Sequence, residues 1–113
     1  MADECIFCKL ASGEIPCEAV YEDEDVFAFR DLHPGAPSHV LVIPRRHIPR
    51  ITDTDDAELL GKLLIGANKV AEKEGLIEKG FRYAVNFGEH GGQLVMHVHI
   101  HVLGGRPLAW PPG

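Results

Sequence analysis

The pattern of apolar and polar residues predicts several short strands along the chain. Short runs rich in apolar residues, bounded by turn-forming residues, are typical of strands. Such runs lie within residues 18–31, 38–44, 81–87 and 94–103. An acidic turn at residues 22–25 divides the first run into two strands, so the pattern predicts five strands in total.

Residues 52–75 carry the pattern of one long helix. Apolar residues recur there at spacings of three and four, at Leu60, Leu63, Leu64, Ala67, Val70 and Ala71. Residues 52–56 offer several N-cap oxygens, and Gly75 suits the C-terminal end. A short helix is expected within residues 6–16, and the Gly-rich segment 88–93 is expected to be a loop.

Five short strands and one main helix, without regular strand–helix alternation, predict the fold class. We expect an α+β domain with a five-stranded antiparallel sheet, one long helix and a short N-terminal helix. The chain has 113 residues and no repeat or linker, so a single domain over residues 1–113 is expected.

The charge of the chain narrows the partners that it can have. Eleven basic and 17 acidic residues leave a formal net charge of -6, which argues against non-specific binding to nucleic acid or to an anionic membrane. No apolar run approaches the roughly 20 residues that span a bilayer. The N-terminus lacks the basic and apolar regions of a signal peptide. A cytoplasmic protein is therefore expected.

The last predicted strand places His97, His99 and His101 at alternate positions. These three side chains should share one face, while the apolar residues between them face the long helix. A solvated polar face is the simpler interpretation of one such histidine, but three in register on an apolar strand favour a site. Zinc–nitrogen bonds of about 2.0–2.1 Å cannot easily join all three on a regular strand to one ion. Phosphate oxygens are suitable partners, and neutral imidazole is a nucleophile.

The segment "HVHIHV" at residues 97–102 resembles the motif of the histidine triad (HIT) family. Residues 15–48 resemble the N-terminal half of that family, and residues 83–106 resemble its catalytic half. The ending "GGRPLAWPPG" is similar to the Hint branch, the purine nucleoside phosphoramidases, more than to the dinucleoside polyphosphate hydrolases of the fragile-histidine branch.

The resemblance implies a reaction at the α-phosphate of a purine nucleoside monophosphate derivative. His99 takes the position of the family nucleophile, which forms a nucleotidyl-histidine that water hydrolyses to AMP or GMP. His97 precedes it, and its carbonyl is expected to orient the His99 ring. His101 is expected to bind phosphate oxygens. No organic cofactor is implied.

Further residues match the nucleotide-binding positions of the family. Asp31 matches the acid that binds the ribose hydroxyls, and Asn86 matches a residue that places the phosphate or leaving group. Gly92 and Gln93 would add hydrogen-bond donors from the Gly-rich loop. The apolar slot for the base would be formed by Phe7, Leu10, Phe29 and Leu32. In one departure, Leu94 stands where the Hint branch commonly has a serine, which predicts slower turnover.

Cys5 and Cys8 form a C-x-x-C pair that is half of a zinc site in form. A redox pair is the alternative, but the thioredoxin-like βαβ context is absent. The resemblance supplies the other two ligands, His47 and His97. A closed Cys₂His₂ set would hold a structural Zn²⁺ rather than a catalytic one.

The resemblance also implies a homodimer, in which the C-terminal tail with Trp110 lies near the partner's active site. Three alternatives to the phosphoramidase stay open at this point. They are a dinucleoside polyphosphate hydrolase, a zinc-stabilised nucleotide-binding scaffold with weak catalysis, and a metallohydrolase that uses a histidine pair.

Overall fold

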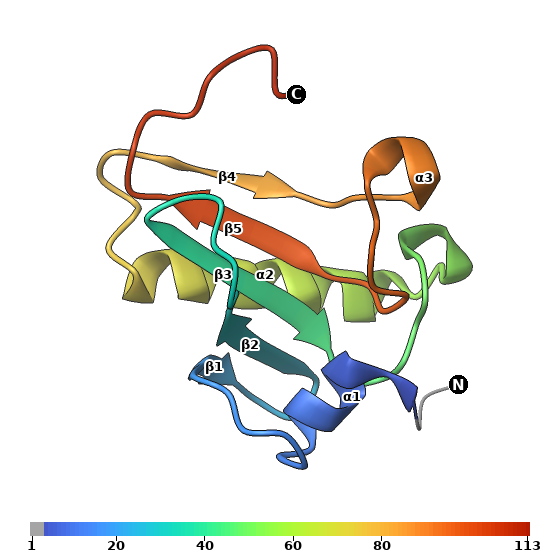
Figure 1. Cartoon of the computed structure of the whole chain (residues 1–113). Helices are drawn as coiled ribbons and strands as arrows, with labels where there is room; N and C mark the ends of the chain where they lie inside the picture. The colour runs from blue at the N-terminus through green and yellow to red at the C-terminus, as the bar shows by residue number, and fades with distance from the viewer. Residues whose placement is uncertain (1–3) are drawn as a thin grey trace.

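The computed structural model describes residues 4–113 and has one sheet with helices on both of its faces (Figure 1). The elements in chain order are α1 (Ile6–Ala11), β1 (Ala19–Glu22), β2 (Val26–Arg30), β3 (Ser38–Pro44), a 3-10 helix (Ile51–Asp53), α2 (Ala57–Lys73), β4 (Phe81–Ala84), α3 (Gly88–Gly91) and β5 (Ile100–Gly104). Among residues 4–113, no helix is long and apolar enough to cross a membrane.

The five strands form one sheet in the order β1-β2-β3-β5-β4, and every neighbouring pair is antiparallel. The predicted α+β class with a five-stranded antiparallel sheet is therefore confirmed. Because β5 lies between β3 and β4, the C-terminal half of the chain inserts its last strand beside the centre of the sheet.

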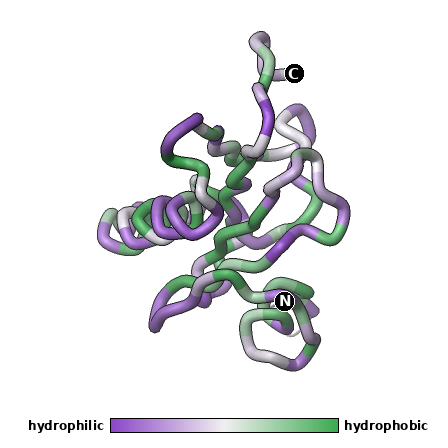
Figure 2. The backbone as a smooth tube through the Cα atoms, turned by 90° about the vertical axis from the view of Figure 1, so that its left-hand side faces the viewer, coloured by the Kyte–Doolittle hydropathy of each residue, from purple (hydrophilic) through white to green (hydrophobic). Residues whose placement is uncertain are grey.

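The two faces of the sheet carry separate apolar clusters. On one face, α2 packs on valines and isoleucines of β2, β3 and β5, and Val98, Ile100 and Val102 belong to this cluster as predicted. On the other face, α1 covers Phe27, Phe29, Leu41 and Ile43. Figure 2 shows hydrophobic and hydrophilic residues alternating around the turns of the long helix α2. The three histidines therefore face the side of the sheet that α1 covers.

The long helix α2 is shorter than its polar flanks suggested. Its N-cap is Asp56, whose carboxylate accepts from the Leu59 amide at 3.0 Å. Gly75 follows the helix with a φ of +72°, which glycine adopts without strain. The buried face contains Leu59, Leu63, Gly66, Ala67, Val70 and Ala71. Leu64 was expected on this face but is exposed.

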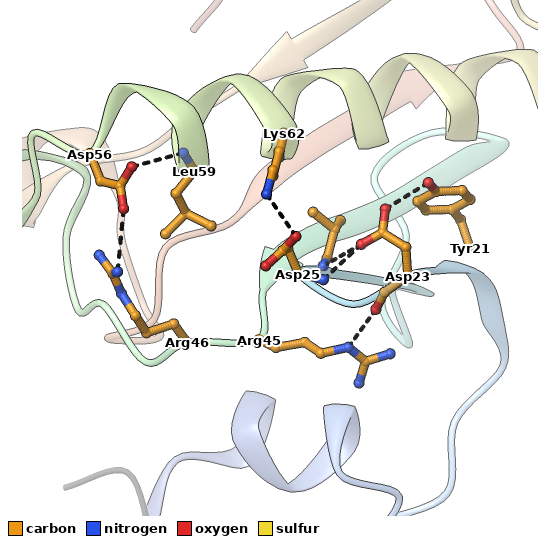
Figure 3. A network of polar contacts seen from close by, with 9 residues as sticks. Tyr21, Asp23, Asp25, Arg45, Arg46, Asp56, Leu59 and Lys62 are labelled. Atoms are coloured by element: carbon orange, nitrogen blue, oxygen red, sulfur yellow. Dashed lines mark hydrogen bonds and ion pairs between the residues drawn. The ribbon is translucent and has the colours of Figure 1, made fainter.

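Polar contacts connect the acidic β1–β2 turn to the start of α2 (Figure 3). The Asp23 carboxylate accepts from the amides of Asp25 and Val26, both at 2.8 Å, which closes the turn. Lys62 of α2 then donates to Asp25 at 3.1 Å. These contacts are half-exposed and contribute little free energy each, but they hold the turn in one place beneath the helix.

The last strand begins later than its alternating pattern predicted. The pairing of β3 with β5 ends where Val42 is opposite Ile100. Two positions further toward the N-terminus, Val98 would face Pro44, which has no N–H to donate to the ladder. Instead, the Val98 amide donates to the Ile48 carbonyl at 2.7 Å. His97 and His99 therefore precede β5, although the alternation of faces continues through them.

Residues 81–93 also differ from the expectation. Strand β4 ends at Ala84 rather than at residue 87, and the expected Gly-rich loop contains the one-turn helix α3. Gly88 and Gly92 flank this turn with φ values of +69° and +76°. The turn holds the chain between β4 and the histidine segment in a compact form.

Candidate active site

The three triad histidines lie in a row beneath α1, and two of them are buried. His97 is fully buried and His99 is 8 % exposed, whereas His101 is half-buried. The rings of His99 and His101 have centroids 4.9 Å apart, closer than a regular strand spacing predicts. A solvated polar face is therefore excluded, and each ring nitrogen needs a partner.

His97 faces the two N-terminal cysteines. Its Nδ1 lies 3.2 Å from Sγ of Cys5, 3.5 Å from Sγ of Cys8 and 3.3 Å from Nδ1 of His47. Its Nε2 lies 2.8 Å from the Pro44 carbonyl. Because a carbonyl can only accept, the proton of His97 is on Nε2, and Nδ1 presents its lone pair to the cysteines.

These four side chains have the donor set and the spacing of a tetrahedral metal site. Tetrahedral zinc with bonds of about 2.0–2.1 Å to nitrogen and 2.3 Å to sulfur separates its ligand atoms by about 3.3–3.8 Å. The separations are 3.3 Å between the nitrogens of His47 and His97, and 3.4 Å between His47 and Sγ of Cys8. All four ligand atoms converge. The predicted ligands Cys5, Cys8, His47 and His97 thus form a cluster that fits a metal ion.

The environment of this cluster favours neutral groups. Burial lowers the pKa of His97 to about 4, with smaller contributions from His47 and His99. Burial and the neighbouring Cys5 raise the pKa of the Cys8 thiol to about 11. His97 is thus ready to donate its lone pair at neutral pH, whereas a metal ion would have to displace the thiol protons.

His99 has the opposite arrangement of its ring nitrogens. Its Nδ1 lies 2.7 Å from the His97 carbonyl, so Nδ1 carries the proton. Within residues 4–113, Nε2 has no protein partner and is not sealed from solvent. Burial lowers the pKa of His99, so the ring is neutral at pH 7 and Nε2 holds a free lone pair. Phe7 stands edge-on to the ring, with centroids 5.1 Å apart, and limits its rotation.

His101 contacts His39, a histidine for which no role was predicted from the sequence. His39 of β3 places its Nε2 2.8 Å from Nδ1 of His101. Burial lowers the pKa of His101 to about 4, and His99 and His39 lower it further. Burial also lowers the pKa of His39. The signal that could have identified His39 is its inward position on β3, opposite the triad strand.

Asp31 follows β2 and lies beside this histidine pair. One carboxylate oxygen accepts from the His33 amide at 2.8 Å, and the other lies 3.5 Å from Nε2 of His39. The candidate ribose acid is thus close to the far end of the triad. Asp31, His39 and His101 also lie close enough together to be considered as a second metal cluster.

Three of the four residues expected to hold the base come together. Phe7 and Phe29 stack edge to face with centroids 5.3 Å apart, and Leu10 packs on the same cluster. Leu32 is 88 % exposed and lies outside this cluster.

The Gly-rich segment is placed differently from the expectation. The backbone amides of Gly92 and Gln93 already donate to carbonyls of Glu89 and Gly88. The Gln93 side-chain amide donates to the carbonyls of Pro49, at 2.8 Å, and Val95, at 3.0 Å. In this conformation Gly92 and Gln93 therefore hold the segment in place, because their donors are used within the protein.

The two other residues of this region remain accessible. Asn86 lies between β4 and α3 and is half-buried, and its backbone packs on Gly91. Leu94 is 91 % exposed, so its side chain does not contribute to the core.

Comparison with known proteins places this site in a family. A model of the HIT domain matches residues 12–108. The chain belongs to the HIT domain family. The resemblance that the histidine motif suggested is therefore confirmed over most of the chain.

Individual HIT proteins are similar over nearly their full length. The chain is 48 % identical to the purine nucleoside phosphoramidase of Escherichia coli K12 over 96 % of this chain and 92 % of that protein. It is 49 % identical to an uncharacterized HIT-like protein of Synechococcus elongatus over the full length of both. The crystal structure of a HIT family hydrolase from Legionella pneumophila matches with a TM-score of 0.94 and 52 % identity, covering 97 % of this chain and all of that one.

The geometry suits His97 and His99 of this HIT domain to different chemical roles. His97 can donate a lone pair to a metal ion, and His99 can donate one to an electrophile near the surface. The difference depends on which ring nitrogen each uses for its hydrogen bond to a backbone carbonyl.

Proposed function

We propose that this HIT protein is a hydrolase that cleaves the P–N bond of purine nucleoside 5′-phosphoramidates and releases AMP or GMP. The observation that carries the proposal is the His99 tautomer, with Nδ1–H held by a carbonyl and Nε2 free at neutral pH. The 48 % identity to a purine nucleoside phosphoramidase supports the substrate class.

The proposed reaction has two displacements at phosphorus. Nε2 of His99 forms a bond to the α-phosphorus while the P–N bond breaks, and the leaving amine takes up one proton. Water then attacks the same phosphorus, the bond to Nε2 breaks, and the proton released from water balances the first step. Splitting the reaction in this way replaces one difficult step with two easier ones.

Nucleotide binding is assigned to residues around His99. Asp31 would accept hydrogen bonds from the ribose hydroxyls, and Phe7, Leu10 and Phe29 would contact the base, with Leu32 as a cover at the surface. Asn86 is assigned to the leaving group. His101 would donate to a phosphate oxygen and stabilise the charge that develops there.

The Cys₂His₂ cluster is proposed to hold a structural Zn²⁺. Thiolate and imidazole donors at these separations suit zinc. When bound, the ion would supply a cross-link between α1, the segment after β3 and the histidine segment. His97 would thereby hold its carbonyl against the His99 ring.

We also propose a homodimer that joins two sheets through β4. Strand β4 is at an edge of the sheet, and unpaired edges are usually covered. Exposed apolar residues flank it, including Val85 and Phe87, and α2 adds Leu64 and Ile65. Arg82 of β4 donates to the Ala109 carbonyl and lies near the exposed Trp110 ring, so the tail leaves from the same edge.

The proposal is tested by trapping the covalent intermediate. The wild-type protein is mixed with radiolabelled adenosine 5′-phosphoramidate, quenched, and analysed for AMP and for adenylate bound to protein. Label on a peptide that contains His99 is expected, and His99→Ala should show neither label nor AMP. His90→Ala is the matched control, because His90 is exposed and has no part in the proposed site. Equal AMP release by wild type and His99→Ala would contradict the proposal.

A further inference from the structure

Cys5 and Cys8 place two thiols at the start of one short helix, α1. Cys5 is the N-cap of α1, and its sulfur accepts from the Cys8 amide at 3.4 Å. The two sulfurs lie within 4.8 Å of each other and of the ring nitrogens of the metal cluster. A disulfide bond of about 2.05 Å can therefore form with a small movement of the two side chains.

The two cysteines differ in their access to solvent. Cys5 is buried, with 9 % of its surface exposed, whereas Cys8 is half-buried. A metal ion holds a coordinated sulfur as the thiolate, which is the form that reacts with peroxides. A small oxidant therefore reaches the Cys8 sulfur first, and the Cys5 sulfur is close enough to react with the product.

We propose that Cys5 and Cys8 are a redox modification site, at which hydrogen peroxide converts the two metal-binding sulfurs to a disulfide, expels the ion and loosens α1 over the nucleotide site. This inference rests on the proposed function for the bound Zn²⁺ and for the nucleotide. The chemistry of the two sulfurs does not depend on the reaction at His99.

The oxidation has two steps at sulfur. The Cys8 thiolate attacks one peroxide oxygen, the O–O bond breaks, and Cys8 becomes a sulfenic acid as hydroxide leaves. The Cys5 thiolate then attacks the Cys8 sulfur, the S–S bond forms, the S–O bond breaks and a second hydroxide leaves. Two protons from solvent convert both hydroxides to water. Each sulfur thus loses one electron, and the peroxide gains two.

The disulfide would remove two of the four ligands of the metal cluster. His47 and His97 alone do not complete the tetrahedron of a structural zinc site. Nδ1 of His97 lies 3.2 Å from Sγ of Cys5 and 3.5 Å from Sγ of Cys8. Loss of the ion would therefore remove the link between α1 and the histidine segment.

The position of Phe7 connects the cysteine pair to the nucleotide site. Phe7 lies between the two cysteines on α1, and its ring centroid is 5.1 Å from that of His99 and 5.3 Å from that of Phe29. A helix of six residues has little stability of its own, so α1 depends on its contacts. In the oxidised protein, we expect Phe7 to be held less firmly beside His99 and the nucleotide to bind more weakly.

The test uses Cys17→Ser, in which Cys5 and Cys8 are the remaining thiols. Cys17 is exposed and outside the cluster, so its replacement should leave activity unchanged. The reduced, zinc-loaded protein is titrated with hydrogen peroxide in the presence of a zinc-sensitive dye. We expect one zinc ion to be released for each pair of thiols lost, with a Cys5–Cys8 disulfide in the peptide masses. A dithiol and added zinc should restore the thiols and the bound ion.

Cys8→His in the same background is the matched variant, because imidazole also binds zinc but cannot form a disulfide. It should keep its zinc at peroxide concentrations that release the ion from Cys17→Ser. The affinity for AMP, measured by calorimetry before and after peroxide, should fall by about 10-fold or more in Cys17→Ser. It should not change in the Cys8→His variant. If that variant binds no zinc, the disulfide and the AMP affinity of Cys17→Ser decide the question.

Zinc release without a Cys5–Cys8 disulfide, or a disulfide that leaves the AMP affinity unchanged, would overturn the proposal. The phosphoramidase assignment fails separately. If the reduced protein released no AMP from adenosine 5′-phosphoramidate while oxidation still expelled zinc and weakened AMP binding, that assignment would fall and the redox site would stand.

Discussion

The two ends of the histidine segment use the same side chain for different tasks. His97 and His101 lie on one face, four residues apart, and both carry their proton on Nε2. Nδ1 of His97 is near two sulfurs and a second imidazole nitrogen. Nδ1 of His101 instead accepts a hydrogen bond from Nε2 of His39, whose Nδ1 accepts from the Gly35 amide. One end is thus suited to a metal ion and the other to an anionic ligand. The partner of one ring nitrogen determines what the other can do.

Alanine substitutions at His97 and His99 should have the largest effects, and they test whether the two histidines have separate roles. His99→Ala should lower turnover of adenosine 5′-phosphoramidate by on the order of 10⁴-fold, because it removes the proposed nucleophile. Its metal content and melting temperature should stay close to wild type. His97→Ala should lose the metal and melt at a lower temperature. Metal analysis, calorimetry and AMP release measure the metal content, the melting temperature and the turnover. If both variants changed these three quantities in the same way, separate roles for His97 and His99 would be rejected.

The metal end alone is tested by Cys5→Ser. The free energy of unfolding should fall by at least about 3 kcal/mol, because the binding energy of a structural zinc ion is part of the folding free energy. The purified wild type should contain one zinc ion per chain. Cys17→Ser is the matched control, because Cys17 is exposed and outside the cluster. The assignment would be contradicted if the purified wild type contained no metal and had the same melting temperature as Cys5→Ser.

The Glu74 carboxylate, which is outside the metal cluster, is expected to make the free energy of unfolding depend on pH. Arg30 donates to both Glu74 oxygens, at 2.6 and 2.8 Å, and Ser38 donates at 2.8 Å. The Arg30 guanidinium holds the pKa of Glu74 below its usual value. Because the folded pKa is the lower one, this stabilisation is complete above the unfolded pKa of about 4.3 and is lost as the pH falls toward the folded pKa.

Glu74→Gln should therefore lower the free energy of unfolding at pH 7 by about 1–3 kcal/mol. The difference from wild type should shrink below about pH 4, where the Glu74 carboxylate becomes protonated. Denaturant unfolding from pH 3 to 7 measures both effects. A difference that stays constant over this range would show that the Glu74 charge is not responsible.

The smallest expected effect lies at the phosphate end. Leu94→Ser restores the hydroxyl that the Hint branch commonly has at this position and should raise kcat by about 3- to 10-fold, the worth of one neutral hydrogen bond. Leu94 is 91 % exposed, so the substitution should not change stability. Leu94→Ala separates the gain of a hydroxyl from the loss of an apolar side chain, and equal rates in the two variants would reject the hypothesis.

The sequence predicted the sheet and the metal cluster well because both depend on short-range patterns and recognisable motifs. Short apolar runs bounded by turn residues identified all five strands, and C-x-x-C with the family resemblance identified Cys5, Cys8, His47 and His97. The predicted start of the last strand was wrong because its pairing stops short of Pro44 on the neighbouring strand β3, and the pattern within residues 94–103 contains no sign of that residue.

The hydrogen-bond partners in the site could not be read from the sequence. His39 is 62 residues from His101, and only the β3–β5 pairing brings the two rings together. Gly92 and Gln93 matched a phosphate-binding position, but their amides are used by the turn of α3. Pattern and motif therefore identify which residues gather at the site, whereas the partners of each nitrogen depend on three-dimensional packing.

The ring tautomers of the triad, measured by long-range ¹H–¹⁵N NMR at neutral pH, test the central claim most directly. We expect a proton on Nε2 of His97, on Nδ1 of His99 and on Nε2 of His101. His99 is the most informative ring, because free neutral histidine favours the other tautomer. A proton on Nε2 of His99 would leave that nitrogen without a lone pair to attack phosphorus and would contradict the proposed mechanism.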